Sequence, residues 1–305
     1  MTLHHPARWG WLLIALSLAL GSGTAFAESM TLRKIQETGV ISIGYRDAST
    51  PFSYLDARQR PVGYSMDICQ RIVDAVKARL QLPELNVRLV PVSSPTRIPL
   101  VANGTVDLEC GVTTNNAERQ QQVSFTVTTF VAESRVLSKR SSPVQTVSAL
   151  SGKVVVSTAG TTSVRHLQDL SRRRGMDVTI LAAKDDAEAF RMVETDRANA
   201  YAMDDVLLRS TVAATGHPED YVISDDALSV EPYGIMLSKN DPEFKRLADE
   251  AIVALFTSGE IFRIYHKWFR APIPPKGVNL QMPLSPALER AFSRPTDSPD
   301  PAVYR

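Results

Sequence analysis

Two kinds of hydrophobic pattern alternate along the chain: short apolar runs, and longer stretches in which apolar residues recur about every 3.6 positions. The runs predict buried strands and the longer period predicts helices that pack one face on a core. The expected strands are 40–44, 85–90 and 106–110, and the expected helices are 67–80 and 97–102. Strands that alternate with helices predict an α/β unit with a mostly parallel sheet and helices on its faces.

The same pattern begins again after residue 150. Expected strands at 153–156, 178–181 and 198–203 alternate with expected helices at 163–174 and 187–194. No internal repeat of the sequence accompanies this recurrence of pattern. The chain is therefore predicted to contain two α/β units of similar design.

Two strand-like segments, 131–137 and 228–233, lead from one unit to the other and back. After the second crossing, a strand, two helices and a Pro-rich tail expected on the surface extend the first unit. The predicted fold class is α/β, with two lobes joined by two hinge crossings. Lobe 1 is expected at 28–131 plus 232–305, and lobe 2 at 132–231.

Residues 1–27 have the three parts of a secretory signal peptide. Arg8 precedes an apolar stretch from Trp9 to Leu20, and small residues lead to Ala25-Phe26-Ala27. The apolar stretch, about 12 residues, is shorter than the roughly 20 that a membrane-spanning helix needs. We expect cleavage after Ala27 and a periplasmic location.

Composition excludes several classes of partner. The chain is 44% hydrophobic and 22% charged, with 34 Lys and Arg against 33 Asp and Glu, so no charge excess favours nucleic acid. Two cysteines are too few for a tetrahedral Cys zinc site, and we expect no metal and no cofactor. Cys69 and Cys110 could form a disulfide, but buried free thiols are the expectation for a helix and an apolar strand.

Common sequence motifs of enzymes are absent from this chain. The sequence contains no G-x-S-x-G, no Gly-rich phosphate loop and no H-E-x-x-H. His166, His217 and His266 lie in charged or loop-like surroundings and are expected at the surface. The residue pattern therefore favours binding over catalysis.

Polar segments follow several of the predicted strands, at the carboxyl ends where open α/β sheets bind ligands. They are 45–52, 93–97, 111–119, 159–163 and 203–205. Arg46, Arg97 and Arg119 in these segments suit carboxylates, since guanidinium groups form bidentate pairs with them. Asp204 balances the arginines. This combination predicts a zwitterionic ligand that carries a second negative group.

The chain resembles the periplasmic amino-acid-binding proteins of ABC importers, solute-binding protein family 3, and within it the glutamate/aspartate-binding branch. The motifs that carry the resemblance are Pro51-Phe52-Ser53-Tyr54, Val62-Gly63-Tyr64-Ser65-Met66-Asp67, Asn103-Gly104-Thr105-Val106-Asp107-Leu108, Glu118-Arg119-Gln120, Gly160-Thr161-Thr162-Ser163, Glu231-Pro232-Tyr233-Gly234-Ile235 and Tyr265-His266-Lys267-Trp268-Phe269. Features of the branch are Arg97-Ile98-Pro99-Leu100, Leu108-Glu109-Cys110-Gly111, Thr113 to Gln120 and Ile273-Pro274-Pro275-Lys276.

The resemblance implies roles for the groups that would hold the amino-acid backbone of a ligand. Arg119 would hold the α-carboxylate together with Thr114 and Thr162. Asp204 would accept hydrogen bonds from the α-ammonium group.

The resemblance also implies a pocket for the ligand's side chain. Arg46, Ser94 and Arg97 would face the side-chain carboxylate. Two positions depart from the branch pattern: Val112 replaces a serine, and Asp186 replaces a histidine that reaches the side-chain carboxylate. The second change affects selectivity, and three arrangements stay open for Asp186: facing the ligand, pairing with an arginine, or turning outward.

The predicted function is capture of one amino acid, glutamate or aspartate, with glutamine or asparagine as open alternatives, and its delivery to the membrane permease of an ABC transporter. We expect a monomer. Two rival interpretations were weighed. One is a small periplasmic enzyme on the same fold, similar to cyclohexadienyl dehydratase, and the other is a ligand-sensing domain of a receptor.

Overall fold

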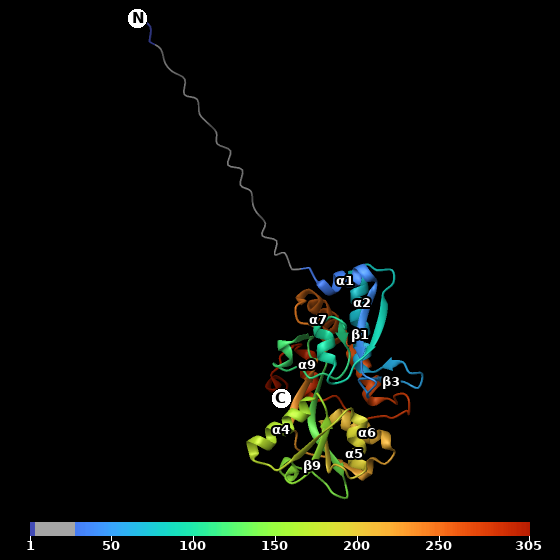
Figure 1. Cartoon of the computed structure of the whole chain (residues 1–305). Coiled ribbons are helices and arrows are strands. Elements are labelled where there is room, and N and C mark those ends of the chain that lie inside the picture. Colours follow the sequence, from blue (N-terminus) through green and yellow to red (C-terminus); the bar gives the residue numbers. More distant parts are fainter. Residues whose placement is uncertain (4–27) are drawn as a thin grey trace.

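The computed structural model describes residues 1–3 and 28–305. It has two lobes, which Figure 1 shows one above the other. The predicted signal peptide lies almost wholly outside the described residues. Within the described part of the chain, no helix is both long enough and apolar enough to cross a membrane.

The first lobe contains a five-stranded sheet. Its strands are Val40–Tyr45 (β1), Asn86–Pro91 (β5), Leu108–Glu109 (β6), Val123–Phe125 (β7) and Met236–Ser238 (β14). Their order is β5-β1-β6-β14-β7; β1 is parallel to β5 and β6, and β14 is antiparallel to β6 and β7. The helices of this part are Met30–Thr38 (α1), Tyr64–Arg79 (α2), Arg97–Ala102 (α3), Pro242–Thr257 (α7), Glu260–Tyr265 (α8) and Pro286–Ser293 (α9). A π-helical turn at His266–Arg270 continues α8.

The second lobe contains a six-stranded sheet. Its strands are Phe130–Lys139 (β8), Val154–Thr158 (β9), Thr179–Ala183 (β10), Ala200–Asp204 (β11), Tyr221–Ile223 (β12) and Ser229–Tyr233 (β13). The order is β10-β9-β11-β8-β12, and β13 also pairs with β8. Its helices are Thr162–Arg174 (α4), Asp186–Glu194 (α5) and Asp205–Thr215 (α6), which Figure 1 shows in the lower lobe.

The prediction of mostly parallel sheets is confirmed by the strand directions, although both sheets are mixed: among the described residues one strand of each sheet runs against the others, β14 in the first and β8 in the second. β9, β10 and β11 are parallel, but β8 is antiparallel to β11, β12 and β13. In both sheets the reversed strand adjoins a crossing: β8 is the first crossing strand, and β14 follows the second crossing. A small antiparallel sheet of Ala48–Ser49 (β2), Ser53–Leu55 (β3) and Pro61–Val62 (β4) was not predicted.

The tail after Pro272 is more ordered than predicted. Ser285 caps α9 by accepting a hydrogen bond from the Leu288 backbone N–H at 3.2 Å, and the helix buries Leu288 and Phe292. The Phe292 ring packs on Phe256 of α7, with centroids 4.7 Å apart. The tail thus lies on the surface as expected, but it contains a helix that the sequence pattern did not predict and that packs one face on α7.

Cys69 and Cys110 form a disulfide, so the expectation of free thiols is wrong. Cys69 lies on the buried face of α2, and Cys110 follows β6. The fold thus brings together two buried residues that are 41 positions apart in sequence. The bond joins α2 to the start of the loop that carries Thr114.

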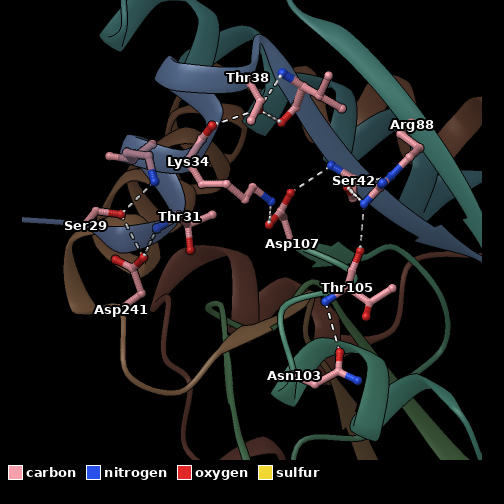
Figure 2. A network of polar contacts seen from close by, with 12 residues as sticks. Ser29, Thr31, Lys34, Thr38, Ser42, Arg88, Asn103, Thr105, Asp107 and Asp241 are labelled. Atoms are coloured by element: carbon pink, nitrogen blue, oxygen red, sulfur yellow. Dashed lines mark hydrogen bonds and ion pairs between the residues drawn. The ribbon is translucent and has the colours of Figure 1, made fainter.

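Two buried carboxylates connect α1 to the rest of the first lobe (Figure 2). Asp107 accepts hydrogen bonds from the Ser42 backbone N–H at 2.8 Å and from the Lys34 ammonium. Asp241 accepts from the Ser29 hydroxyl and the Thr31 backbone N–H, both at 2.8 Å. Burial works to raise the pKa of Asp241, but these hydrogen bonds outweigh it and hold the pKa below its usual value.

Aromatic packing fixes the two crossing strands to the first lobe. Phe52 makes edge-to-face contacts with Phe130 at the start of β8 and with Tyr233 at the end of β13, at centroid distances of 4.9 and 5.4 Å. Phe130 also stacks on Phe269 at 5.2 Å. Each crossing strand therefore has one end in the core of the first lobe and pairs within the sheet of the second.

Candidate functional site

A small cavity of about 20 Å³ lies between the lobes, and we call it the interlobe cavity. It is lined by Arg46, Ser94, Arg97, Val112, Thr114, Thr161, Thr162, Asp186, Met203, Asp204 and Leu207. This volume is close to what one water molecule requires, so the two lobes meet closely here and must move apart to admit a larger solute. Every predicted site residue except Arg119 lines the cavity.

The polar lining residues follow strands or begin helices, as the sequence pattern predicted. From the first lobe, Arg46 follows β1, Arg97 begins α3, and Thr114 follows β6. From the second lobe, Thr162 begins α4 and Asp204 ends β11. Because parallel strands end at the same edge of a sheet, residues far apart in sequence meet at this edge.

The arginines of the first lobe are buried with free donors. Arg46 is 7% exposed and Arg97 is 2% exposed. Arg97 donates to the Val112 carbonyl oxygen at 3.1 Å. Arg46 Nε and Nη1 and Arg97 Nε have no hydrogen-bond partner among the described residues. Buried charged donors without acceptors are costly, so these guanidinium groups are suited to an anionic ligand.

Neighbouring charges perturb the arginine cluster. Burial, and then the positive charges of Arg119 and Arg46, lower the pKa of Arg97, and the Glu109 carboxylate opposes this shift. Burial also lowers the pKa of Arg119, against the attraction of Glu231 and other carboxylates. The positive charges of the cluster therefore repel one another in a buried site, and an anion bound among the arginines would stabilise their charged forms.

Arg119 lies just behind the cavity and contacts both lobes. Its Nη1 donates to the Thr114 carbonyl oxygen at 2.8 Å, and its Nη2 donates to the Gly160 carbonyl oxygen at 3.4 Å. Gly160 belongs to the turn that precedes α4. The guanidinium group is thus placed beside Thr114 and the first turn of α4, near the two residues with which it was predicted to act.

Asp204 has one occupied and one free carboxylate oxygen. The Tyr233 hydroxyl donates to Oδ2, and the buried Oδ1 has no partner among the described residues. Burial, together with the negative charge of Glu231, raises the pKa of Asp204 well above its usual value. A cationic donor at Oδ1 would stabilise the ionised form, and an ammonium group has that chemistry.

Thr162 is held by a buried acid of the return crossing. Its hydroxyl donates to Glu231 Oε2 at 2.8 Å, and His166 Nε2 lies 3.0 Å from Glu231 Oε1. Burial works to raise the pKa of Glu231, but hydrogen bonds from His166 and Ser229 outweigh it and lower the pKa. The His166 side chain is 37% exposed, in agreement with the predicted surface position, while its ring contacts the buried Glu231.

Asp186 lines the interlobe cavity, so the arrangement in which it turns outward is wrong. Its Oδ1 accepts hydrogen bonds from the Thr158 hydroxyl at 2.5 Å and the Tyr201 hydroxyl at 3.1 Å. Within the described residues it makes no ion pair with Arg46 or Arg97, so the second arrangement is not observed either. Two neutral donors hold the carboxylate at the cavity wall.

Three residues beside the site were not predicted as part of it: Glu231 and Tyr233, which contact site residues, and Glu109, whose charge acts on Arg97. Glu109 is fully buried; its Oε2 accepts from the Thr113 hydroxyl at 2.8 Å, while Oε1 has no partner among the described residues. Each of these residues lies within a motif that carried the resemblance. For Glu109, the sequence signal was an acidic residue inside an apolar predicted strand, because buried carboxylates are rare unless they are paired.

A family described as bacterial extracellular solute-binding proteins, family 3, matches residues 41–271. The chain belongs to this family. A relative from Pseudomonas aeruginosa, the L-glutamate/L-aspartate-binding protein, is 49% identical over 286 residues, covering 93% of this chain and 95% of the relative. The glutamate/aspartate import solute-binding protein of Escherichia coli is 44% identical over 299 residues, covering 97% of this chain and 99% of the relative.

Solved structures with this fold include two-lobed amino-acid-binding proteins. A mutant of ArgBP from T. maritima has a TM-score of 0.70 at 24% identity and covers 78% of this chain and 99% of its own. An ancestral amino acid-binding protein, described as a precursor of cyclohexadienyl dehydratase, has a TM-score of 0.67 at 25% identity over 79% of this chain and 100% of its own. The predicted two-lobed fold is confirmed.

Membership of solute-binding family 3 confirms the interpretation of the chain as an extracytoplasmic binding protein. The relatives at 44% and 49% identity are binding proteins, so the enzyme alternative is not favoured. The family description places its members outside the cytoplasm. The geometry of the interlobe cavity fits this function, because its side chains present donors and acceptors suited to holding a charged solute.

Proposed function

We propose that this solute-binding protein captures L-glutamate or L-aspartate and delivers it to the membrane permease of an ABC importer. The observation that carries the proposal is the set of unpaired buried groups: guanidinium donors of Arg46 and Arg97 on one lobe, and a carboxylate oxygen of Asp204 on the other. An acidic amino acid supplies one partner for each kind of group. The names of the two relatives support the same ligand.

In the proposed complex, Arg119 holds the α-carboxylate, beside Thr114 and the first turn of α4. Because the Thr162 hydroxyl proton is directed to Glu231, the backbone N–H at this helix start is the better donor to the carboxylate. Asp204 Oδ1 accepts from the ammonium group. These three contacts use groups that all α-amino acids share, so they set affinity but not selectivity.

The side-chain carboxylate of the ligand would lie between Arg46, Ser94 and Arg97, opposite Asp186. The free Arg46 Nε and Nη1 and the free Arg97 Nε are donors for it. An ionised Asp186 can accept hydrogen bonds but cannot donate them to a carboxylate. The preference for glutamate over glutamine, or for aspartate over asparagine, is therefore proposed to be smaller than in a pocket that contains two arginines and no carboxylate.

Binding is coupled to closure of the two lobes. We assign lobe 1 to 28–131 plus 232–305 and lobe 2 to 132–231, with β8 and β13 as hinge strands. A ligand that bonds to arginines of one lobe and to Asp204 of the other stabilises the closed form over the open one, which is the differential affinity that a population shift requires. In this proposal the chain acts as a monomer in the periplasm after cleavage at Ala27.

Titration calorimetry of the purified protein against the twenty amino acids tests the ligand class. We expect one-site binding of glutamate and aspartate, weaker binding of glutamine and asparagine, and no binding of cationic amino acids, because Arg46 and Arg97 repel them. Preferential binding of arginine, lysine or an aliphatic amino acid would contradict the proposal.

A further inference from the structure

A second, larger cavity of about 540 Å³ adjoins the interlobe cavity, and we call it the lateral cavity. Its walls come from both lobes: Ala48, Thr50 and the segment 273–278 from the first, and helices α5 and α6 from the second. Asp186 and Leu207 line both cavities. Only these two side chains are common to the walls, so the lateral cavity begins where the pocket for the ligand's side chain ends.

The lateral cavity offers apolar wall surface to an uncharged group, beside the charged side chains of Arg191, Glu194 and Lys276. Phe190, Leu207 and Ile273 are buried residues that line it, and Pro274 and Pro275 add apolar surface. The volume falls within the range of small-molecule sites, roughly 300 to 1,000 Å³. Lys276 spans the lobes by donating to the Ala214 carbonyl oxygen at 3.3 Å, at the carboxyl end of α6. The cavity therefore persists while the lobes are closed.

Asp186 supplies a hydrogen-bond acceptor at the junction of the two cavities. Its two protein contacts, from Thr158 and Tyr201, both reach Oδ1, and no hydrogen bond from a described residue reaches Oδ2. An ionised carboxylate has about four acceptor positions, so Asp186 retains capacity for a ligand N–H. Arginine donors lie across the same cavity and suit a carbonyl oxygen.

We propose that the protein also binds side-chain amides of glutamate whose amide nitrogen carries an uncharged substituent. The amide carbonyl would accept from Arg46 or Arg97, the remaining amide N–H would donate to Asp186 Oδ2, and the substituent would occupy the lateral cavity. This inference rests on the proposed function, because the α-carboxylate and ammonium groups would use the contacts assigned there.

The test is calorimetry with four probes: L-glutamate, L-glutamine, Nδ-ethyl-L-glutamine and Nδ-benzyl-L-glutamine. Wild-type protein should bind both substituted amides within about tenfold of L-glutamine. The variant Ala187→Trp should weaken Nδ-benzyl-L-glutamine at least tenfold and change glutamate and glutamine less than threefold. Ala187 is an exposed residue of α5 that lines the lateral cavity but not the interlobe cavity, so the larger side chain occupies space without entering the ligand's backbone site.

Ala78→Trp is the matched control, because Ala78 is an exposed helical alanine of α2 that lines neither cavity. It should change binding of no probe. Two results would overturn the inference while leaving the proposed function intact. One is binding of the substituted amides to the wild type more than 100-fold more weakly than glutamine. The other is binding of the substituted amides to Ala187→Trp as tight as their binding to the wild type. Absence of binding by glutamate and glutamine themselves would overturn the proposed function instead.

Discussion

At the scale of single residues, Arg97 and Asp204 of the interlobe cavity share one arrangement: a protein partner holds one polar atom of the side chain, and another polar atom has no partner among the described residues. Arg97 donates to the Val112 carbonyl oxygen and keeps Nε free, and Asp204 accepts from Tyr233 and keeps Oδ1 free. Fixed partners keep the free atoms oriented before the ligand arrives. Preorganisation of this kind reduces the ordering cost of binding.

Arg119→Ala should abolish binding of every amino-acid ligand, since all of them share the α-carboxylate. Hydrogen bonds to charged groups contribute roughly 1.5 to 3 kcal/mol each, so loss of a bidentate pair should weaken binding at least about 100-fold by calorimetry. Arg119→Lys keeps the charge without the planar fork and should give an intermediate affinity. Affinity of the alanine variant within tenfold of wild type would remove Arg119 from the site.

Asp204→Asn should stabilise the ligand-free protein and weaken amino-acid binding. Because burial raises the pKa of Asp204 above that of the unfolded chain, the unfolded state releases this proton first as pH rises. The wild-type protein therefore loses stability between about pH 4, the unfolded pKa, and the raised folded pKa, and the asparagine variant lacks this loss. Without ligand, the melting temperatures of the wild-type protein and of Asp204→Asn should coincide near pH 4. At pH 7 the melting temperature of Asp204→Asn should be higher than that of the wild type.

The control for Asp204→Asn is a dicarboxylate without an amino group, such as 2-oxoglutarate. Its affinity should fall less than that of glutamate, since it has no ammonium group to lose a partner. Equal losses for the two ligands would show that Asp204 does not contact the ammonium.

Asp186→His should increase the ratio of glutamate affinity to glutamine affinity. The imidazole can donate to the side-chain carboxylate, whereas the native carboxylate repels it, and one hydrogen bond to a charged group is worth about 1.5 to 3 kcal/mol, or roughly 10- to 150-fold. Glu188→His on the same helix, outside both cavities, should leave the ratio unchanged. An unchanged ratio in Asp186→His would shift selectivity to Arg46, Ser94 and Arg97.

At the scale of elements, the turn between β9 and α4 approaches the first lobe backbone to backbone. Gly160 has φ of +75°, and a Cβ atom there would lie 2.9 Å from the Pro95 nitrogen and 3.0 Å from the Ser94 carbonyl carbon. Neither neighbour is the flexible end of a side chain. Closure of the lobes therefore requires a residue without a side chain at this position.

Gly160→Ala should lower glutamate affinity at least tenfold by obstructing closure. A left-handed conformation also costs an L-residue about 1 to 2 kcal/mol, so stability falls as well. Gly152→Ala separates the two effects, because Gly152 has φ of +72° but a Cβ added there would have no atom of a described residue within 4 Å. Equal loss of affinity in both variants would contradict the assignment of Gly160 to closure.

The positions of helices and strands show how much of the secondary structure the hydrophobic pattern predicts. The helix predicted at 97–102 is observed as Arg97–Ala102, and most other predicted elements are observed within a few residues of their expected bounds, whereas the helices α1 and α6 were not predicted. β2 and β4 contain two residues each, which is too few to show the alternation of hydrophobic and polar residues that identifies a strand. Their pairing with β3 could therefore not be predicted from the hydrophobic pattern. The signals for α9, Ser285 as a cap and Pro286 at the first turn, were present but lay within a Pro-rich tail.

At the scale of the whole molecule, two half-sites of opposite character face each other. The first lobe contributes arginines and the second contributes Thr162, Asp186 and Asp204. Glu118 of the first lobe and Arg165 of α4 also form an ion pair between the lobes, but both side chains are about half exposed, and such pairs contribute little. Hydrogen bonds from Arg119 to Gly160 and from Tyr233 to Asp204 also join the lobes, and a ligand adds to these links by bonding to both lobes.

The meeting of these half-sites was predictable only in part. The rule that ligands bind at the carboxyl ends of strands placed Arg46 and Asp204 at a common edge. The contacts that hold Asp204 and Thr162, from Tyr233 and Glu231, depend on how the return crossing packs between lobes. That packing involves pairs far apart in sequence, and the disulfide between Cys69 and Cys110 was misjudged for the same reason.

A crystal structure of the protein with L-glutamate tests the central claim most directly. The account predicts one ligand in the interlobe cavity, with its α-carboxylate on Arg119, its ammonium group on Asp204 Oδ1, and its side-chain carboxylate on Arg46 and Arg97. Density for glutamate outside this cavity, or contacts to the residues of one lobe only, would contradict it.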